Sequence, residues 1–113
     1  MIKSCEPNNE NYSCPIEKTL SIIGSKWTLL ILRDLSNGTK RFGQLQKSLK
    51  GISPKTLSSR LQELEKEGII IKKVYPEVPP RVEYTFTPKG ERLRKIVLAL
   101  ADWGSEDHTA LGV

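Results

Sequence analysis

The chain has 113 residues and a mass of 12.7 kDa, and its 18 Lys and Arg against 13 Asp and Glu give a formal net charge of +5. This length suits one domain, and a hydrophobic content of 37% argues against intrinsic disorder and collagen-like structure. No apolar run approaches the roughly 18 residues of a membrane span, and no signal-peptide core follows Met1. We therefore expect a cytoplasmic protein without a membrane partner.

The first third of the chain predicts a polar tail and two helices. Residues 1–13 are polar, and we expect a flexible N-terminal tail there. Pro15 suits a first helical position, and an apolar i, i+4, i+7 series follows it up to Gly24. A second helix opens at Ser25 and stops at Asn37-Gly38. It has so little polar surface that we expect it to be central and buried; its apolar residues are Trp27, Leu29, Leu30, Ile31, Leu32 and Leu35.

The remaining elements follow in a recognisable order. A short third helix is expected from about Arg41 to Leu49, and a fourth, capped by Ser53, ends at Gly68. Residues 69–75 and 82–86 are rich in β-branched and aromatic residues and predict two strands, joined by a Pro-rich tip at 76–81. A last helix starts at Thr87-Pro88. This order predicts a mostly helical α+β domain, a helix-turn-helix followed by a wing, over residues 14–105 with a C-terminal tail at 106–113.

The acidic residues avoid the middle of the chain. The 28 residues from Leu35 to Gln62 contain no Asp or Glu, while six cations lie there: Lys40, Arg41, Lys47, Lys50, Lys55 and Arg60. A basic stretch of this kind indicates a polyanionic partner. The alternative is an ordinary solvent-exposed face in which the lack of acidic residues over this stretch is a coincidence.

The expected fourth helix has the chemistry of a DNA-reading helix. Three leucines fix its inward face, and the opposite face and flanks carry Lys55, Thr56, Ser58, Ser59, Arg60, Gln62 and Lys66. Its first two turns are free of acids, which suits base edges and phosphates in a major groove. Glu63, Glu65 and Glu67 begin only where such a helix would leave the groove. The alternative is an ordinary amphipathic helix with a charged solvent face.

Several motifs resemble the HxlR-type family of winged-helix transcriptional regulators. They lie in the family's order at Cys14–Leu20 (CPIEKTL), Ile23–Thr28 (IGSKWT), Arg41–Leu45 (RFGQL), Gly51–Ser53 (GIS), Leu61–Glu65 (LQELE), Tyr75–Tyr84 (YPEVPPRVEY) and Thr87–Gly90 (TPKG). The resemblance runs from Cys14 to about Trp103-Gly104. Thr85-Phe86 precedes Thr87 where the family more often has a Leu.

The resemblance implies a homodimer that binds double-stranded operator DNA with two related half-sites. Carried over residue by residue, it assigns DNA contacts to Lys40, Arg41, Ser53, Lys55, Thr56, Ser59, Arg60 and Arg81. Among these, Lys40 and Arg41 are expected at phosphates and Arg81 at the wing tip. Lys72 and Lys73 lie on the first wing strand, where alternation lets only one of them face the DNA.

The resemblance also implies a dimer interface from the N-terminal segment and the last helix. Its expected residues there are Leu93, Ile96, Val97, Leu100 and Trp103. Leu98, Ala99 and Ala101 leave further apolar surface on the same helix, and a helix with two apolar faces often has a partner. The alternative is a well-buried terminal helix.

Cys14 directly precedes Pro15, where a helix N-terminus favours the thiolate. Some members of the resembled family use the cysteine at this place to sense oxidants, quinones or aldehydes. The alternative is a small capping residue. Cys5, in the expected tail, is either a resolving partner for Cys14 or an irrelevant thiol.

Other functions have little support in the sequence. Two cysteines and the single His108 lack the spacing of a zinc site, and we expect neither a metal nor another cofactor. No Gly-rich phosphate loop or catalytic triad pattern is present, so we expect no enzyme. A winged helix that binds another protein instead of DNA remains an alternative.

Overall fold

The computed structural model describes residues 14–110, with side chains up to Glu106. The elements are α1 (Pro15–Ile23), α2 (Lys26–Leu35), β1 (Lys40–Arg41), α3 (Phe42–Ser48), α4 (Pro54–Lys66), β2 (Ile70–Tyr75), β3 (Arg81–Phe86) and α5 (Pro88–Ala110). The five expected helices and both expected strands are present. The expected N-terminal tail and Cys5 lie outside the described residues. Helix α5 continues past residue 105, where we expected the domain to end.

Local capping explains where the helices of the helix-turn-helix begin. The Ser53 hydroxyl accepts a hydrogen bond from the backbone N–H of Thr56 at 3.1 Å, and Pro54 occupies the first turn of α4. The turn between α3 and α4 passes through Gly51, whose φ of +93° is a conformation that side-chain-bearing residues avoid. The amide of Gln46 donates to the carbonyl of Ile52 at 3.3 Å and ties α3 to this turn.

Helix α2 lies at the centre of the fold, as its sequence predicts. Ile31, Leu32 and Leu35 are almost fully buried in one continuous apolar core. The core residues contributed by the other elements are Ile23, Leu45, Leu49, Ile52, Leu57, Leu61, Leu64, Ile69, Ile70, Tyr84, Leu93 and Val97. One core therefore joins the four helices α1 to α4 to the sheet and to the first half of α5.

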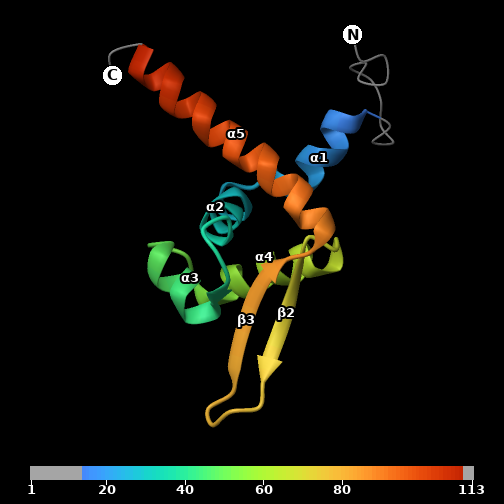
Figure 1. Ribbon diagram of the computed structural model, residues 1–113, viewed down its shortest axis with the longest axis vertical. Helices are drawn as coiled ribbons and strands as arrows, with labels where there is room; N and C mark the ends of the chain where they lie inside the picture. Colours follow the sequence, from blue (N-terminus) through green and yellow to red (C-terminus); the bar gives the residue numbers. More distant parts are fainter. Residues whose placement is uncertain (1–13, 111–113) are drawn as a thin grey trace.

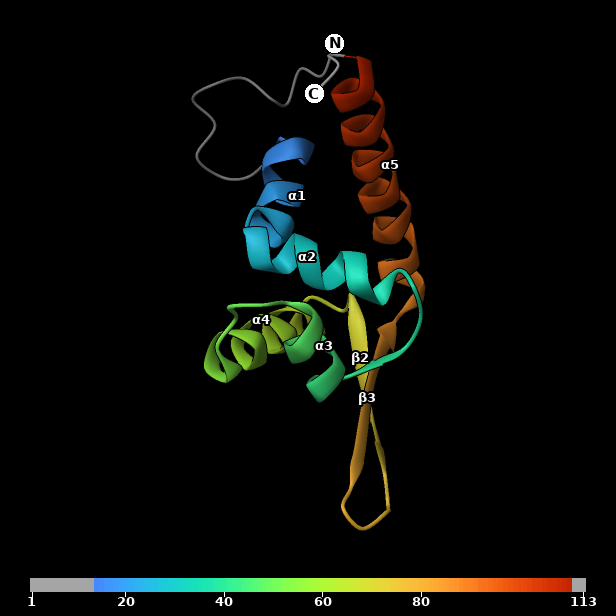
Figure 2. The same cartoon turned by 90° about the vertical axis from the view of Figure 1, so that its left-hand side faces the viewer.

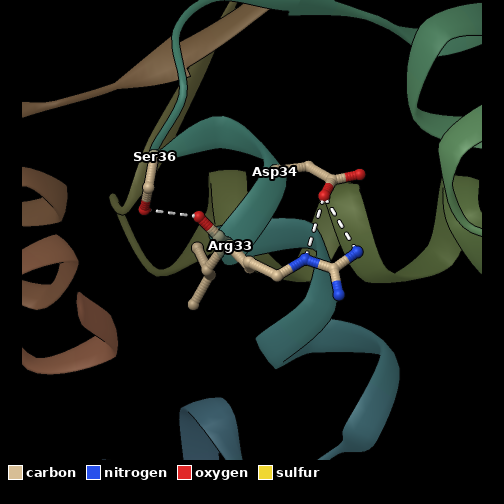
Figure 3. Close-up of polar contacts among 4 residues, drawn as sticks. Arg33, Asp34 and Ser36 are labelled. Carbon is tan, nitrogen blue, oxygen red and sulfur yellow. Dashed lines mark hydrogen bonds and ion pairs between the residues drawn. The ribbon is translucent and has the colours of Figure 1, made fainter. Parts of the chain in front are cut away.

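The end of α2 buries a charged side chain (Figure 3). Asp34 Oδ1 accepts hydrogen bonds from Nε and Nη2 of Arg33, at 3.1 and 3.0 Å. Its other oxygen, Oδ2, has no hydrogen-bond partner among the described residues. The Ser36 hydroxyl donates to the Leu32 carbonyl at 2.8 Å, and the Ser36 carbonyl accepts from Arg94 of α5 at 3.2 Å. The hydrogen bond from Arg94 therefore ties the end of α2 to α5.

The wing belongs to a three-stranded antiparallel sheet with strand order β1-β3-β2. Strand β1 was not predicted, because two residues are too few for an alternating pattern to show. Lys40 pairs with Tyr84 and Arg41 with Glu83. Arg81 pairs with Tyr75 and opens β3, so it begins a strand and does not belong to the connecting tip. The pairing of β1 with β3 places the start of α3 next to the wing.

Two elements project from opposite ends of the molecule (Figures 1 and 2). The β2–β3 hairpin extends away from the helices at one end, and the second half of α5 extends away at the other. This elongated arrangement is the winged helix-turn-helix fold that the sequence predicts. No helix in the described part of the chain is long and apolar enough to span a membrane.

A tight junction joins the end of α4 to the start of α5. The Thr87 hydroxyl donates to the carbonyls of Gly68 and Ile69, and the N–H of Gly90 donates back to this hydroxyl at 3.0 Å. Gly90 lies so close to the chain that a Cβ there would stand 1.9 Å from the Ile69 carbonyl oxygen. Only glycine fits this contact, so the motif Thr87–Gly90 serves here as a structural joint.

Candidate nucleic-acid interface

Helix α4 presents the side chains expected of a DNA-reading helix on its exposed side. Leu57, Leu61 and Leu64 are at most 1% exposed. Because they face the core, the opposite face of α4 points towards solvent. Lys55 and Ser59 are exposed on that face. Thr56 is half-buried, and its hydroxyl accepts a hydrogen bond from the Ser53 hydroxyl at 2.9 Å. Ser53 is therefore engaged as the helix cap.

Arg60 is less available than its position on the helix suggests. Its Nη1 lies 3.1 and 3.2 Å from the two carboxylate oxygens of Glu63, one turn along α4. The Arg60 side chain is one-third exposed. An exposed pair of this kind is weak. A phosphate could therefore displace Glu63 and engage the guanidinium group.

Lys40 and Arg41 lie where β1 passes into α3. Arg41 is exposed at the N-cap of α3, and its N–H donates to Oε1 of Gln44 at 2.8 Å. Lys40 is half-buried and lines a cavity of about 160 Å³ together with Asp34. The two cations therefore lie at the entrance of the helix-turn-helix, with Arg41 the more accessible one.

The wing holds Arg81 in a set of contacts that the sequence analysis missed. Its guanidinium group lies 3.2 Å from a carboxylate oxygen of Glu77 and 3.4 Å from one of Glu83. It also stacks over the Tyr75 ring, 4.1 Å from the ring centroid. The i, i+4 spacing of Glu77 and Arg81 was the one signal in the sequence that could have indicated the first contact. The charge of Arg81 is thus partly neutralised by two acids.

A cavity separates the wing from the start of α3. Its volume is about 410 Å³, and its lining includes Arg41 and Phe42 on one side and residues 77–82 on the other. Arg41 and Arg81 both line it, although they are far apart in the sequence. The fold therefore brings together the two arginines that were assigned to α3 and to the wing.

Strand register separates Lys72 from Lys73. Lys72 pairs with Tyr84, whose side chain is buried towards the helices, whereas Lys73 pairs with Glu83 on the other face. Both lysines are exposed. Burial, and secondly the nearby carboxylate of Glu65, raise the pKa of Tyr84 above its ordinary value of 10.0. This tyrosine therefore stays neutral at physiological pH and adds no charge to the wing.

The apolar residues expected at a dimer interface divide into two groups. Leu93 and Val97 pack into the core of their own chain, whereas Ile96, Leu100 and Trp103 are 48%, 50% and 67% exposed. The rest of the described chain therefore does not bury these last three side chains, which form an outer apolar stripe on α5. The alternative of a well-buried terminal helix does not fit this chain taken alone.

Cys14 lies at the N-cap of α1, as expected, and its side chain is only 2% exposed. The side chain makes no capping hydrogen bond to the helix. Its backbone carbonyl accepts the N–H of Lys18 at 3.0 Å. The residue therefore occupies a helix N-terminus without acting as a side-chain cap.

Comparison with known proteins assigns the chain to a family. The HxlR-like helix-turn-helix family model matches residues 22–110, most of the sequence. The chain belongs to the HxlR family. The sll1512 protein of Synechocystis, named as an HTH-type transcriptional regulator, is 45% identical over 93 residues, which cover 82% of this chain and 69% of that protein.

Solved structures agree with the HxlR assignment. A protein of Porphyromonas gingivalis W83, named as a MarR-family transcriptional regulator, superposes with a TM-score of 0.80 at 42% identity and covers 89% of this chain and 97% of its own. The redox regulator HypR in its oxidised form superposes with a TM-score of 0.78 at 40% identity, over 82% of this chain and 96% of its own. This HxlR chain is therefore a transcriptional regulator with a winged helix-turn-helix domain.

Proposed function

We propose that this protein binds double-stranded operator DNA as a homodimer in the cytoplasm and recognises an inverted repeat. The observation that carries the proposal is the exposed, acid-free beginning of α4, with Lys55 and Ser59 on its outer face. We place this helix in the major groove, with Arg41 and the wing arginine Arg81 at neighbouring phosphates or in the minor groove. Each protomer of the dimer would read one half-site.

Exposed apolar side chains support the homodimer. Ile96, Leu100 and Trp103 form a stripe at i, i+4, i+7 on α5, and Ile16 and Leu20 are 52% and 54% exposed on α1. An exposed apolar stripe on a projecting helix is costly in water and favours a second apolar surface. A second copy of the chain supplies one with matching symmetry.

In vitro selection from a random DNA pool tests the proposed function directly. We expect an inverted repeat whose half-sites are about one helical turn apart, and binding that falls steeply with salt. Recovery of no preferred sequence, with no salt-dependent binding to duplex DNA, would favour the alternative of a protein-interaction module.

The wing arginine gives a prediction with opposite signs for two variants. Arg81→Ala should weaken operator binding and reduce the slope of log affinity against log salt by about one. Glu77→Gln should strengthen binding, because it removes one acid that competes for the Arg81 guanidinium. Gel-shift titrations at several salt concentrations measure both. An unchanged slope in Arg81→Ala would show that the wing arginine does not contact phosphate.

Breaking the apolar stripe should produce a monomer. Leu100→Glu combined with Trp103→Glu should raise the dimer dissociation constant at least 100-fold, because two charges would be buried at the interface (about 1.4 kcal/mol is tenfold). Sedimentation velocity measures the oligomeric state. Ile71→Glu, which adds a charge at a 46% exposed apolar position on the wing, is the control and should leave the dimer intact. A dimer that survives the double substitution would place the interface elsewhere.

We further propose that Cys14 senses oxidants or electrophiles such as quinones or aldehydes. Two features support this: its place at the N-terminus of α1, which favours the thiolate, and the similarity to the redox regulator HypR. In the structure the Cys14 sulfur is part of a disulfide, and its side chain is 2% exposed. The thiolate that would sense an oxidant is therefore the one that reduction of this disulfide releases.

Oxidation of wild type and Cys14→Ser should separate sensing from a structural role. Protein reduced with dithiothreitol and protein oxidised with diamide should differ at least fivefold in operator affinity for wild type and not for Cys14→Ser. Gel shift measures affinity, and mass spectrometry reports the state of the thiol. Cys5→Ser tests whether the other cysteine takes part. Equal responses of wild type and Cys14→Ser would exclude Cys14 as the sensor.

A further inference from the structure

Asp34 is a buried carboxylate with one oxygen left unpartnered. Its side chain is 9% exposed and lies one residue before the end of α2, where the helix dipole is negative and disfavours an acid. The Arg33 guanidinium group occupies Oδ1, and Oδ2 has no hydrogen-bond partner among the described residues. Figure 3 shows this second oxygen turned away from Arg33. Because the Arg33 side chain is half-exposed, their ion pair offsets only part of the cost of burying the carboxylate.

A polar cavity of about 160 Å³ adjoins this carboxylate. Its lining comes from the end of α2 and the loop after it, from β1 and from α3, and consists of Asp34, Asn37, Lys40, Gln44 and Ser48. Among these lining residues Lys40 is the only cation, and the other three partners that Asp34 has there are neutral. A carboxylate gains more from an ammonium group than from a neutral donor, because a charge-assisted hydrogen bond is roughly twice as strong. Lys40 is therefore the favoured partner for Oδ2.

Strand pairing directs Lys40 towards this cavity. Lys40 of β1 pairs with Tyr84 of β3, and paired residues point to the same face of a sheet. Tyr84 is 7% exposed and belongs to the core, so this face packs against the helices. Lys40 is half-buried there and belongs to no salt bridge within residues 14–106. A flexible cation without an acid partner thus lines the same cavity as a carboxylate with an unpartnered oxygen.

Two other cations that we assign to DNA have acids as neighbours. Arg60 and Arg81 each form salt bridges with nearby glutamates, which a phosphate would have to displace. Asp34 stands in the same relation to Lys40. The difference is that Asp34 is buried, so it loses more when it gives up a partner than an exposed glutamate does.

We propose that Asp34 binds the Lys40 ammonium group in the DNA-free protein and competes with the operator for it. The Lys40 side chain turns so that its Nζ donates to Oδ2 of Asp34. When the protein binds DNA, the ammonium group moves from the carboxylate to a phosphate. Asp34 is thus a positioning residue that acts through Lys40. The move to a phosphate rests on the proposed DNA-binding function, whereas the ion pair does not.

The ion pair is tested without DNA by NMR of the lysine ammonium groups. An ion-paired ammonium group exchanges its protons with water more slowly than a free one and gives an observable ¹H–¹⁵N signal. Wild type should show such a signal for Lys40, with a scalar coupling through the hydrogen bond to the carboxyl carbon of Asp34. This measurement needs no substitution, so it does not depend on the folding of any variant. Absence of the coupling would overturn the ion pair.

Three variants check which group holds the ammonium. The Lys40 signal should disappear in Asp34→Asn and persist in Asp34→Glu, which keeps the charge. Ser48→Ala removes a neutral donor from the same cavity and is the matched control, with the signal kept. Circular dichroism confirms that each variant is folded. A signal that is unchanged in Asp34→Asn, or lost equally in Ser48→Ala, would overturn the assignment of Asp34 as the partner.

Operator affinity tests the competition. Asp34→Asn should bind the operator at least threefold more tightly than wild type, because Lys40 no longer has to leave a carboxylate. Lys40→Met should bind more weakly and reduce the slope of log affinity against log salt by about one. Asp34→Asn should give no gain in the Lys40→Met background, since the competition needs both groups. Gel-shift titrations at several salt concentrations measure all four proteins.

Glu91→Gln is the control for the loss of one negative charge. Glu91 is exposed in the first turn of α5 and lies outside the lining of the cavity, so its replacement should change affinity less than twofold. A gain from Asp34→Asn that persists in the Lys40→Met background would reduce the effect to net charge and overturn the competition. Weaker binding by Asp34→Asn would overturn it as well. Failure of the protein to bind any DNA would contradict the proposed function and leave the NMR test of the ion pair unaffected.

Discussion

Gly90→Ala is expected to destabilise the protein by about 3 kcal/mol. The added Cβ would stand 1.9 Å from the Ile69 carbonyl oxygen and 2.8 Å from Cδ1 of Phe86. Backbone must shift to relieve the first contact, and this backbone is held by the hydrogen bonds that Thr87 makes to Gly68 and Ile69. Urea unfolding followed by circular dichroism measures the change in the free energy of unfolding.

Gly104→Ala is the matched control for this prediction. Gly104 belongs to the same helix, and nothing lies within 4 Å of a Cβ placed there. Alanine favours a helix interior over glycine, so this variant should gain up to about 1 kcal/mol. A Gly90→Ala protein as stable as wild type would show that the joint between α4 and α5 is not rigid.

Lys55→Ala and Arg60→Ala should each weaken operator binding by about 1–3 kcal/mol, roughly fivefold to 150-fold, without unfolding the protein. Lys55 is exposed in the first turn of α4 and makes no salt bridge within the described residues. Arg60 must first leave Glu63, so its loss should have the smaller effect. Gel-shift titration on the selected operator measures the affinities, and circular dichroism confirms folding.

Lys66→Ala is the control for charge loss on the same helix. Lys66 is exposed in the last turn of α4, among Glu63, Glu65 and Glu67, where the helix is expected to have left the groove. Its replacement should change affinity less than threefold. Equal losses at Lys55 and Lys66 would indicate non-specific attraction and contradict the placement of the start of α4 in the groove.

Most of the local structure was predictable because its causes are local. Pro15, and Ser53 with Pro54, mark helix starts by their own backbone and capping preferences, and α1 and α4 begin there. The leucine series in α4 fixed its buried face, and all three leucines are buried. Strand β1 was missed because its two residues exist as a strand only through pairing with β3.

For the candidate site, the sequence predicted which residues of α4 are exposed but not the contacts of the wing arginine. The sequence placed Lys55 and Ser59 on one exposed face of a helix, and the structure has them exposed on α4. It did not reveal that Arg81 lies between Glu77 and Glu83 and over Tyr75. Those contacts depend on the strand register of the wing, which sequence spacing alone does not determine.

The sequence by itself determined that this is a small winged helix-turn-helix chain whose fourth helix has no acid in its first two turns. Helix caps, apolar period and the position of charges are properties of neighbouring residues. Only the tertiary structure decided which apolar side chains of α5 remain exposed. Leu93 and Val97 are covered by the core, while Ile96, Leu100 and Trp103 are left in water. The helical spacing of apolar residues along the sequence does not distinguish these five side chains. Their burial depends on whether another element packs against each of them.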